Sequence, residues 1–339
     1  MFTSTIERIG EMTEASAIPT NDEPRRTCLA MPGGEPCARR ALDGKPYCAE
    51  HLGPLRGRKP RDVKEFLTEW RDVAEFAIGR RLRGEGPGRD DHDPELVKAA
   101  MPLGLPLYSW YWRCDVFGIE NIPTEGPALL AANHSGTIPV DGAMLKIAVL
   151  KEHGRNPWLL AADLAFKMPI FRDIIRMAGN ARADRSETVG LLRKGELIGV
   201  FPEGFKGIGK GWKKRYQLQR FGRGGFVEVA IETGAPIIPV AIIGGEEAYP
   251  MIADLKPLAR RFGLPYFPIT PTFPLLGPLG ALPLPSKWII AIGEPIPTAG
   301  FGADAVEDTQ LVLETAEETR QRVQALIKEY LLHRRNAFF

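Results

Sequence analysis

The chain has 339 residues, 44% of them hydrophobic, which is enough apolar material for one large domain or two smaller ones. Its 44 lysines and arginines against 42 aspartates and glutamates leave a net charge of +2, which indicates no bulk attraction to nucleic acid. No uninterrupted apolar run of bilayer-spanning length occurs, and the N-terminus lacks the apolar core of a signal peptide, so we expect a cytoplasmic protein.

The first 54 residues divide into a tail, residues 1–24, which we predict to be disordered, and a small cysteine-rich module, residues 25–54. The module contains four candidate zinc ligands, Cys28, Cys37, Cys48 and His51. Zinc prefers four sulfur and imidazole ligands, and the close spacing of the last two lets one turn supply both. The first gap is wider than usual, so unlinked thiols in a disordered tail are the alternative. We predict a structural zinc site.

Residues 55–95 combine a basic linker with an amphipathic helix. The linker runs from Arg56 to Pro60, and from Asp62 to Leu82 apolar residues recur at helical spacing. The apolar face of this helix either packs on the main domain or lies on a bilayer, where arginines at the helix end would meet lipid phosphates. We favour packing, because most amphipathic helices are simply half-buried.

From residue 96 to residue 339, apolar runs alternate with helical patterns. Strands are predicted at residues 112–119, 128–132, 158–162, 197–201, 236–243 and 288–292. Helices are predicted at residues 142–152, 171–178, 187–193 with Ser186 as the N-cap, 224–233 and about 306–333. Strands separated by helices indicate an α/β fold with a largely parallel sheet covered by helices.

Two polar motifs directly follow predicted buried strands. Asn133-His134-Ser135-Gly136 follows the first strand, with Asp141 further along, and Phe201-Pro202-Glu203-Gly204 ends the second. An α/β sheet presents its chemistry at such strand ends. An imidazole has an ordinary pKa of about 6.5, so His134 suits a base that takes a proton from a hydroxyl, and Asp141 suits a partner for the other ring nitrogen. The alternatives are a core histidine and an aspartate that caps the next helix.

With these motifs the chain resembles the glycerophospholipid (PlsC-like) acyltransferase family, in particular 1-acylglycerol-3-phosphate acyltransferases, from roughly Tyr108 to the C-terminus. The resemblance implies an O-acyltransferase that moves a fatty acyl group from acyl-CoA or acyl carrier protein to the hydroxyl of a lysophospholipid or related glycerolipid. His134 would be the general base and Asp141 its orienting partner. The family usually places four residues between this pair, whereas six intervene here.

The resemblance also implies acceptor-binding residues. Arg185 would contact the acceptor's phosphate or glycerol, as a planar cation with paired donors can; a solvated surface arginine is the alternative. Glu203, Gly204 and Lys206 would bind substrate. The family follows this glycine with Thr-Arg-Ser, whereas this chain has Phe205-Lys206-Gly207, which leaves a neutral glyceride as the alternative acceptor.

Two further segments indicate anionic or apolar partners. Seven cations lie between residues 206 and 223, and no acidic residue occurs from Phe205 to Val227. Such a loop suits the phosphates of coenzyme A, an acidic carrier protein or anionic lipid headgroups, and a solvated loop is the alternative. The proline-rich residues 265–285 are either exposed, as a membrane or acyl-chain contact, or core. We expect peripheral association with a membrane.

A function of another class remains open. The cysteine-rich module and the basic linker would recruit a partner, and the acyltransferase-like domain would be catalytically idle. Among aromatic residues only Tyr47 lies near these cations, which argues against nucleic acid as that partner.

Overall fold

The computed structural model describes Val97, Met101 and residues 104–136, 138, 140–161, 178–263, 265–334 and 336–338. The chain divides into two units, Met1–Arg56 and Gly57–Phe339, and every described residue belongs to the second. The predicted zinc ligands Cys28, Cys37, Cys48 and His51 and the predicted amphipathic helix lie outside the described residues. So does nearly all of the helix predicted at residues 171–178.

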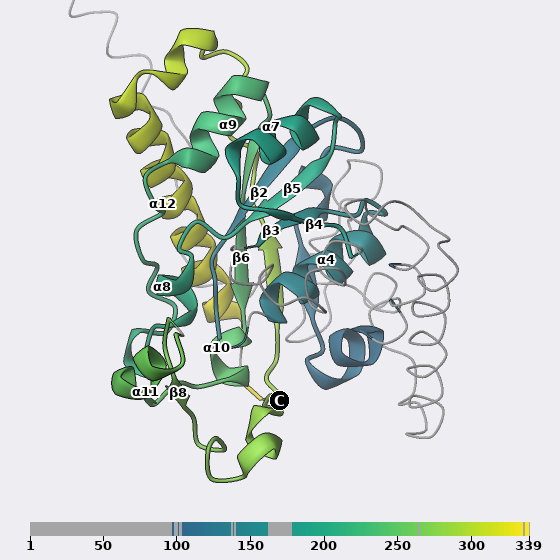
Figure 1. Cartoon of the computed structure of the whole chain (residues 1–339). Coiled ribbons are helices and arrows are strands. Elements are labelled where there is room, and N and C mark those ends of the chain that lie inside the picture. The colour runs from purple at the N-terminus through teal and green to yellow at the C-terminus, as the bar shows by residue number, and fades with distance from the viewer. Residues whose placement is uncertain are drawn as a thin grey trace, which may run out of the picture. The chain divides into compact units, whose positions relative to one another are not determined.

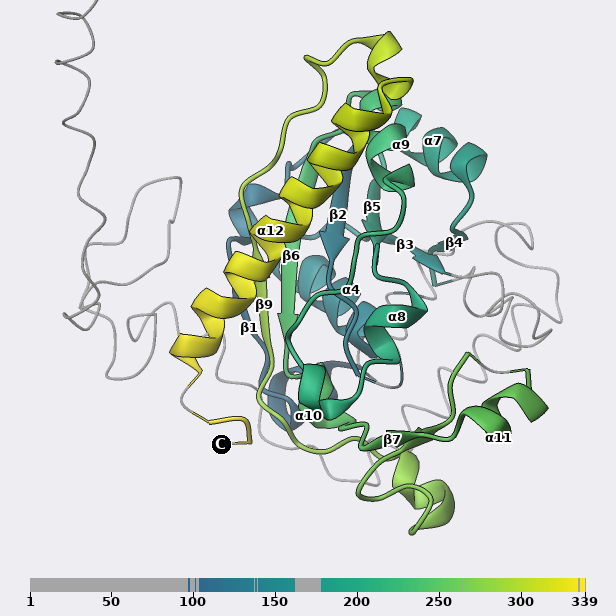
Figure 2. The same cartoon turned by 90° about the vertical axis from the view of Figure 1, so that its left-hand side faces the viewer.

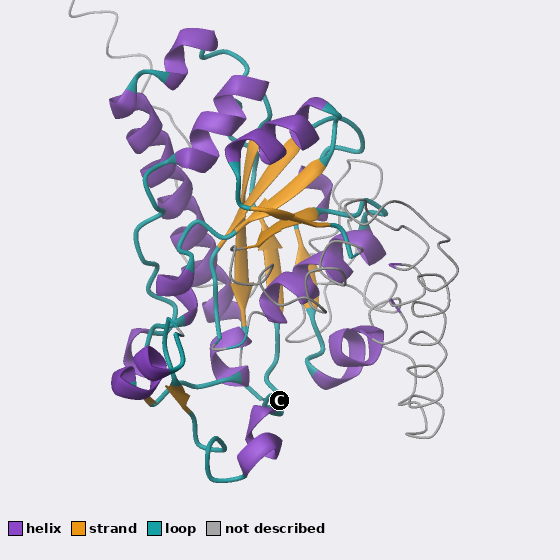
Figure 3. Ribbon diagram, in the orientation of Figure 1, coloured by secondary structure: helices purple, strands orange, loops and turns teal. Residues whose placement is uncertain are grey.

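A seven-stranded sheet lies at the centre of this unit (Figures 1 and 3). Its spatial order is β1 (Asp115–Phe117), β9 (Ile289–Ile292), β6 (Ile237–Ile243), β2 (Ala128–Ala132), β5 (Leu197–Val200), β3 (Trp158–Ala161) and β4 (Asn180–Arg182). All neighbours in this order are parallel except β6 and β9. The predicted largely parallel α/β sheet is therefore confirmed.

Helices cover both faces of the sheet, and this explains why every residue of β2 and β6 is buried. On one face lie α4 (Val140–Glu152) and the π-helix η3 (Leu107–Tyr111), whose buried side chains share a core cluster with Leu130, Ile238 and Ile290. On the other lie α7 (Arg185–Arg193), α9 (Gly225–Thr233) and α12 (Thr309–His333) (Figure 2). The apolar runs of the sequence are thus buried from both sides.

Two of the helices, α7 and α12, begin where an aspartate caps them rather than at the predicted residue. Asp184, not Ser186, caps α7, because its backbone is extended and its Oδ1 accepts the N–H of Glu187 at 3.0 Å. α12 begins at Thr309, because Asp308 caps it and residues Ala303–Val306 form a separate 3-10 helix, η7. One strand is also shorter than predicted. β1 begins at Asp115 rather than at residue 112, since Arg113 has a left-handed φ of 47° that interrupts the extended backbone.

Short elements connect β5, β6 and β9. α8 (Phe205–Ile208) and the 3-10 helix η5 (Trp212–Lys214) follow β5, and α10 (Gly245–Ala248) follows β6. Then come β7 (Ala253–Asp254), α11 (Lys256–Arg261), β8 (Pro268–Ile269) and the 3-10 helix η6 (Gly277–Ala281). A further 3-10 turn, η4 (Ile119–Asn121), follows β1. α10, α11 and β7 lie beyond the carboxyl ends of β2 and β6, and α8 lies near the carboxyl end of β2 (Figures 1 and 2).

Within the described part of the chain, no helix combines the length and the apolar character that crossing a bilayer requires.

Candidate active site

His134 and Asp141 form a hydrogen-bonded pair at the carboxyl end of β2. The ring Nδ1 of His134 lies 2.7 Å from Oδ2 of Asp141. The same carboxylate accepts the N–H of Ser135 at 2.8 Å and that of Gly142 at 2.9 Å. Asp141 is fully buried, and the six residues between the pair fold back so that the first turn of α4 meets the end of β2. The pairing assigns the ring proton to Nδ1 and leaves Nε2 free to accept another proton.

Two neighbours hold the His134 loop in place. The side-chain amide of Asn133 donates to the carbonyl of Ile242 at 2.9 Å and accepts the N–H of Ile242 at 2.6 Å. Asn133 thereby continues the hydrogen bonding between β2 and β6 at the point where the main chain turns away. The ring of His134 stacks on Phe201, with centroids 4.4 Å apart, and 13% of its side chain is exposed. The imidazole is fixed in orientation and still reachable from solvent.

Glu203 lies beside His134, and both of its carboxylate oxygens accept hydrogen bonds from the protein. Its Oε1 accepts the backbone N–H of His134 at 3.0 Å, and its Oε2 accepts that of Gln219 at 2.6 Å. Lys210 approaches the same Oε2 at 3.6 Å, and the Glu203 side chain has no exposed surface. The contacts seen here therefore hold the backbone that carries His134.

Gly207 allows α8 to approach this pair closely. A Cβ built on Gly207 would lie 2.8 Å from the Cβ of Glu203 and 2.9 Å from that of His134, which is too close for any side chain. This residue was not singled out from the sequence. The clash with His134 is with a residue distant in the chain, so no local pattern indicates that contact.

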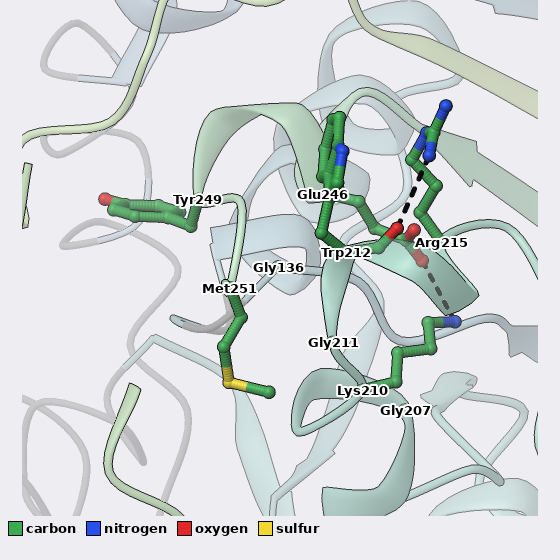
Figure 4. Close-up of a pocket in the computed structure, with 9 residues that line it drawn as sticks. All are labelled: Gly136, Gly207, Lys210, Gly211, Trp212, Arg215, Glu246, Tyr249 and Met251. Atoms are coloured by element: carbon green, nitrogen blue, oxygen red, sulfur yellow. Dashed lines mark hydrogen bonds and ion pairs between the residues drawn. The ribbon is translucent and has the colours of Figure 1, made fainter. Parts of the chain in front are cut away.

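A buried polar network continues from Lys210, next to the loop that carries His134. Lys210 forms an ion pair with Oε1 of Glu246 at 2.9 Å (Figure 4), and Oε2 of Glu246 accepts the N–H of Tyr216 at 2.7 Å. Burial raises the pKa of Glu246 to about 7, and the charge of Lys210 opposes that rise. Lys210 and Glu246 border a small pocket that Gly136 and Gly207 also line (Figure 4). Sequence reasoning missed Glu246, since its motif, Gly245-Glu246-Glu247, has no distinctive spacing.

The other predicted site residues, Arg185, Gly204 and Lys206, form no hydrogen bond or ion pair with His134 in the described structure. Arg185, at the start of α7, forms ion pairs with Glu228 and, at 2.9 Å, with Glu232, both on α9. Lys206 is exposed on α8 and has no ion pair within the described residues. Gly204 precedes α8 with a φ of 55°, which glycine adopts without strain.

No group of three or more metal-ligating side chains occurs among the described residues, and the predicted zinc ligands lie outside them. Cys114 is buried in the core, and burial raises the pKa of its thiol. The imidazole of His134, fixed in orientation and partly exposed, is chemically able to accept a proton from a hydroxyl.

Comparison with known proteins identifies several relatives. A family model described as Acyltransferase matches residues 113–243, which include His134, Asp141 and Glu203. The uncharacterized protein Rv0502 of Mycobacterium tuberculosis is 52% identical over 284 residues, covering 83% of this chain and 78% of that protein. The uncharacterized protein ML2427 of Mycobacterium leprae is 51% identical over 251 residues, covering 73% of this chain and 68% of that one.

Two more distant proteins carry a named activity. The human "DGAT1/2-independent enzyme synthesizing storage lipids" is 29% identical over 220 residues, covering 64% of this chain and 61% of that enzyme. The crystal structure of the 1-acyl-sn-glycerophosphate acyltransferase PlsC from Thermotoga maritima superposes with a TM-score of 0.46 at 19% identity, covering 80% of this chain and 96% of that one.

Proposed function

Because the chain belongs to the acyltransferase family and is an O-acyltransferase, we propose that it moves a fatty acyl group from a thioester to a glycerolipid hydroxyl, with His134 as the general base. The observation that carries this proposal is the 2.7 Å contact between His134 and the buried Asp141. It orients the imidazole and leaves Nε2 for the acceptor.

In the proposed reaction, Nε2 of His134 takes the proton of the acceptor hydroxyl as the oxygen attacks the thioester carbonyl. Asp141 stabilises the imidazolium that forms. When the tetrahedral intermediate collapses, the C–S bond breaks, and the imidazolium returns its proton to the departing thiolate. The products are an ester and a free thiol, and His134 is regenerated neutral.

Replacing His134 with alanine tests this assignment. We expect turnover to fall at least about 10²-fold, the usual contribution of a positioned base, with an unchanged melting temperature. His333→Ala is the matched control, because His333 is an exposed histidine at the end of α12. Turnover retained in a folded His134→Ala variant would reject the base assignment.

We propose acyl-CoA or acyl carrier protein as the donor. The cationic loop that follows Glu203 supports this, because its exposed members include Lys206, Lys213, Lys214, Arg220 and Arg223. Lys213→Gln combined with Lys214→Gln should raise KM for acyl-CoA while leaving KM for an acyl-pantetheine, which lacks the nucleotide phosphates, unchanged. An equal effect on both donors would contradict a phosphate-binding role for this loop.

The acceptor is proposed to be a lysophospholipid or related glycerolipid, and a neutral glyceride is the second candidate. The name of the human relative, an enzyme that synthesizes storage lipids, and the Phe205-Lys206-Gly207 sequence favour the second. We keep Arg185 and Lys206 as proposed acceptor contacts. Assays with lysophosphatidic acid and with mono- and diacylglycerol, read by product mass, discriminate the two candidates. If product forms with lysophosphatidic acid and not with mono- or diacylglycerol, the neutral glyceride is rejected as the acceptor.

We also propose that Cys28, Cys37, Cys48 and His51 hold a structural Zn²⁺. The support is their residue types and the close spacing of the last two. Elemental analysis of the purified full chain should find roughly one zinc per molecule, lost in a Cys48→Ser/His51→Ala variant and kept in the core variant Cys114→Ser. A zinc-free wild-type chain would overturn the proposal.

A further inference from the structure

Exposed apolar side chains concentrate in one stretch of the chain, residues 252–282, which we call the apolar segment. Its exposed members are Ile252, Leu255, Phe262, Leu275, Leu276, Leu279 and Leu282. Leu275 is 83% exposed and Leu279 is 66% exposed. Soluble surfaces rarely gather so many large apolar side chains without a partner for them.

The apolar segment is attached to the domain at both ends. At its start, the N–H of Trp212 donates to the carbonyl of Met251 at 2.8 Å, and the N–H of Ile252 donates to Ile269 at 2.8 Å, next to the β7–β8 pairing. At its end, the N–H of Leu284 donates to Ala248 at 2.9 Å. The hydroxyl of Tyr111 donates to the carbonyl of Pro283 at 2.6 Å. The apolar side chains are thus presented by an anchored backbone.

The prolines of this stretch suit a weakly hydrated environment. Proline has no backbone N–H, so each one removes a donor whose dehydration would otherwise cost free energy. Six of them lie between residues 265 and 283, namely Pro265, Pro268, Pro271, Pro274, Pro278 and Pro283.

The apolar segment carries a net positive charge, because Asp254 is its one acidic residue and its cations are Lys256, Arg260 and Arg261. Lys256, Arg260 and Arg261 are exposed on α11, and none of them pairs with a carboxylate in the described part of the chain. No acidic residue occurs from Leu255 to Gly293. Exposed leucines beside unpaired cations are the combination that favours an anionic lipid interface.

The apolar segment lies at the same end of the unit as His134. α11 and β7 lie beyond the carboxyl end of β2, from which His134 emerges (Figures 1 and 2). Gly209, just after α8, packs against Tyr266 so closely that a Cβ there would meet the ring at 3.3 Å. Ile138 and Phe205, near the active site in sequence, are 37% and 42% exposed. A surface in contact with the apolar segment would therefore also face the site.

We propose that residues 252–282 are the docking surface that places the enzyme on an anionic lipid bilayer. The leucines and Phe262 enter the boundary between headgroups and acyl chains, and the α11 cations meet lipid phosphates. The docking surface adds to the proposed function the place from which the substrate comes. It rests on that function in one respect, namely that His134 would receive a lipid acceptor from the bilayer. An acidic carrier protein is disfavoured as the occupant, because a polar partner would leave the leucines without apolar contacts.

Vesicle flotation of the full chain tests the surface without any assay of catalysis. Wild-type protein should float with vesicles of phosphatidylcholine and phosphatidylglycerol. Leu275→Glu combined with Leu279→Glu should lower the partition coefficient at least about tenfold, since each buried leucine side chain contributes more than that. Leu332→Glu is the matched control, because Leu332 is 78% exposed on α12 and should leave partitioning unchanged.

Charge removal gives a second arm. The triple variant Lys256→Gln, Arg260→Gln and Arg261→Gln should weaken binding to anionic vesicles by about fivefold per charge and leave the weaker binding to pure phosphatidylcholine unchanged. Its control removes three exposed cations elsewhere, Lys194, Arg322 and Lys328. Wild-type protein that stays in the aqueous fraction, or leucine variants that float as well as Leu332→Glu, would overturn the docking surface.

Failure of the docking surface and failure of the proposed reaction are distinguishable. The leucine variant should lose turnover on vesicle-embedded acceptor and keep it on a short-chain, monomeric acceptor. The His134→Ala variant should lose turnover on both and still float. Wild-type protein that floats but yields no product would overturn the reaction and leave the docking surface standing.

Discussion

Asp141 directs both carboxylate oxygens at fixed donors. Oδ2 lies 2.7 Å from the His134 ring and accepts the N–H of Ser135, while Oδ1 accepts the N–H of Gly142. An amide at this position keeps the shape but loses the negative charge that stabilises an imidazolium. We therefore expect Asp141→Asn to reduce kcat by about 10²–10⁴-fold. The measurement is kcat at saturating donor and acceptor, with Asp304→Asn, an exposed aspartate in η7, as the control.

Glu203 offers a test between two roles. Substrate binding, predicted from the sequence, would make Glu203→Gln raise KM for the acceptor. The alternative role is to position the backbone of His134, to which Glu203 is hydrogen-bonded, as it is to Gln219. In that role Glu203→Gln would lower kcat and leave KM unchanged, because one buried backbone N–H would then face the N–H donor of the new amide. We expect the second pattern, together with a loss of stability of about 1–3 kcal/mol. Steady-state kinetics and urea unfolding measure the two effects, and a change in KM alone would restore the substrate-binding role.

For single residues, the sequence was a better guide to which side chains lie at the candidate site than to the groups that these side chains contact. His134 and Glu203 could be found because each follows a buried apolar run, where α/β folds place reactive groups. The contacts of the Glu203 carboxylate could not be predicted, because they depend on Gln219 and Lys210. These two residues lie on a loop whose path no local pattern determines. The ion pairs of Arg185 with α9 are equally a product of tertiary packing.

Among the helices, α7 shows how a cap is chosen. Asp184 and Ser186 are both suitable N-cap residues, yet only Asp184 has the extended backbone that brings its side chain to the N–H of Glu187. Asp184→Ala should lower the free energy of unfolding by about 1 kcal/mol, whereas Ser186→Ala should leave it nearly unchanged. Urea unfolding of both variants measures this difference, and equal losses would contradict the assignment.

The elements that periodicity could predict are those with long buried runs. β2, β5, β6 and β9 lie within a residue of their predicted bounds, because central strands covered on both faces are almost wholly apolar. The two-residue strands β7 and β8 have no period to detect. The late start of β1 reflects the backbone of Arg113, whose positive φ is stabilised by tertiary contacts that its guanidinium makes with the carbonyls of Pro285 and Phe338.

The pH dependence of stability belongs to the whole molecule, and Glu246 sets part of it. Its pKa is raised from 4.5 to about 7 by burial, so the folded chain binds this proton more tightly than the unfolded chain does. The stability from this group is present below about pH 4.5 and is lost as the pH rises through 7. Urea unfolding at pH 5 and at pH 8 measures how much the free energy of unfolding decreases between them. We expect this decrease to be smaller in Glu246→Gln than in wild type. Glu307→Gln is the control, because Glu307 is exposed, and it should show the same pH dependence as wild type. An equal decrease in the free energy of unfolding in wild type and Glu246→Gln would contradict this prediction.

Within the seven-stranded sheet, β6 and β9 are the antiparallel neighbours of an otherwise parallel arrangement. The chain thus leaves β6 at Ile243 and enters β9 at Ile289, at the same end of the sheet. Such a hairpin-like return needs no crossover helix, whereas a parallel link must carry the polypeptide back across a face. Residues can therefore be inserted into or deleted from this excursion without rethreading the sheet. Evolution is free to change the length of residues 244–288 while the imidazole of His134 stays in place.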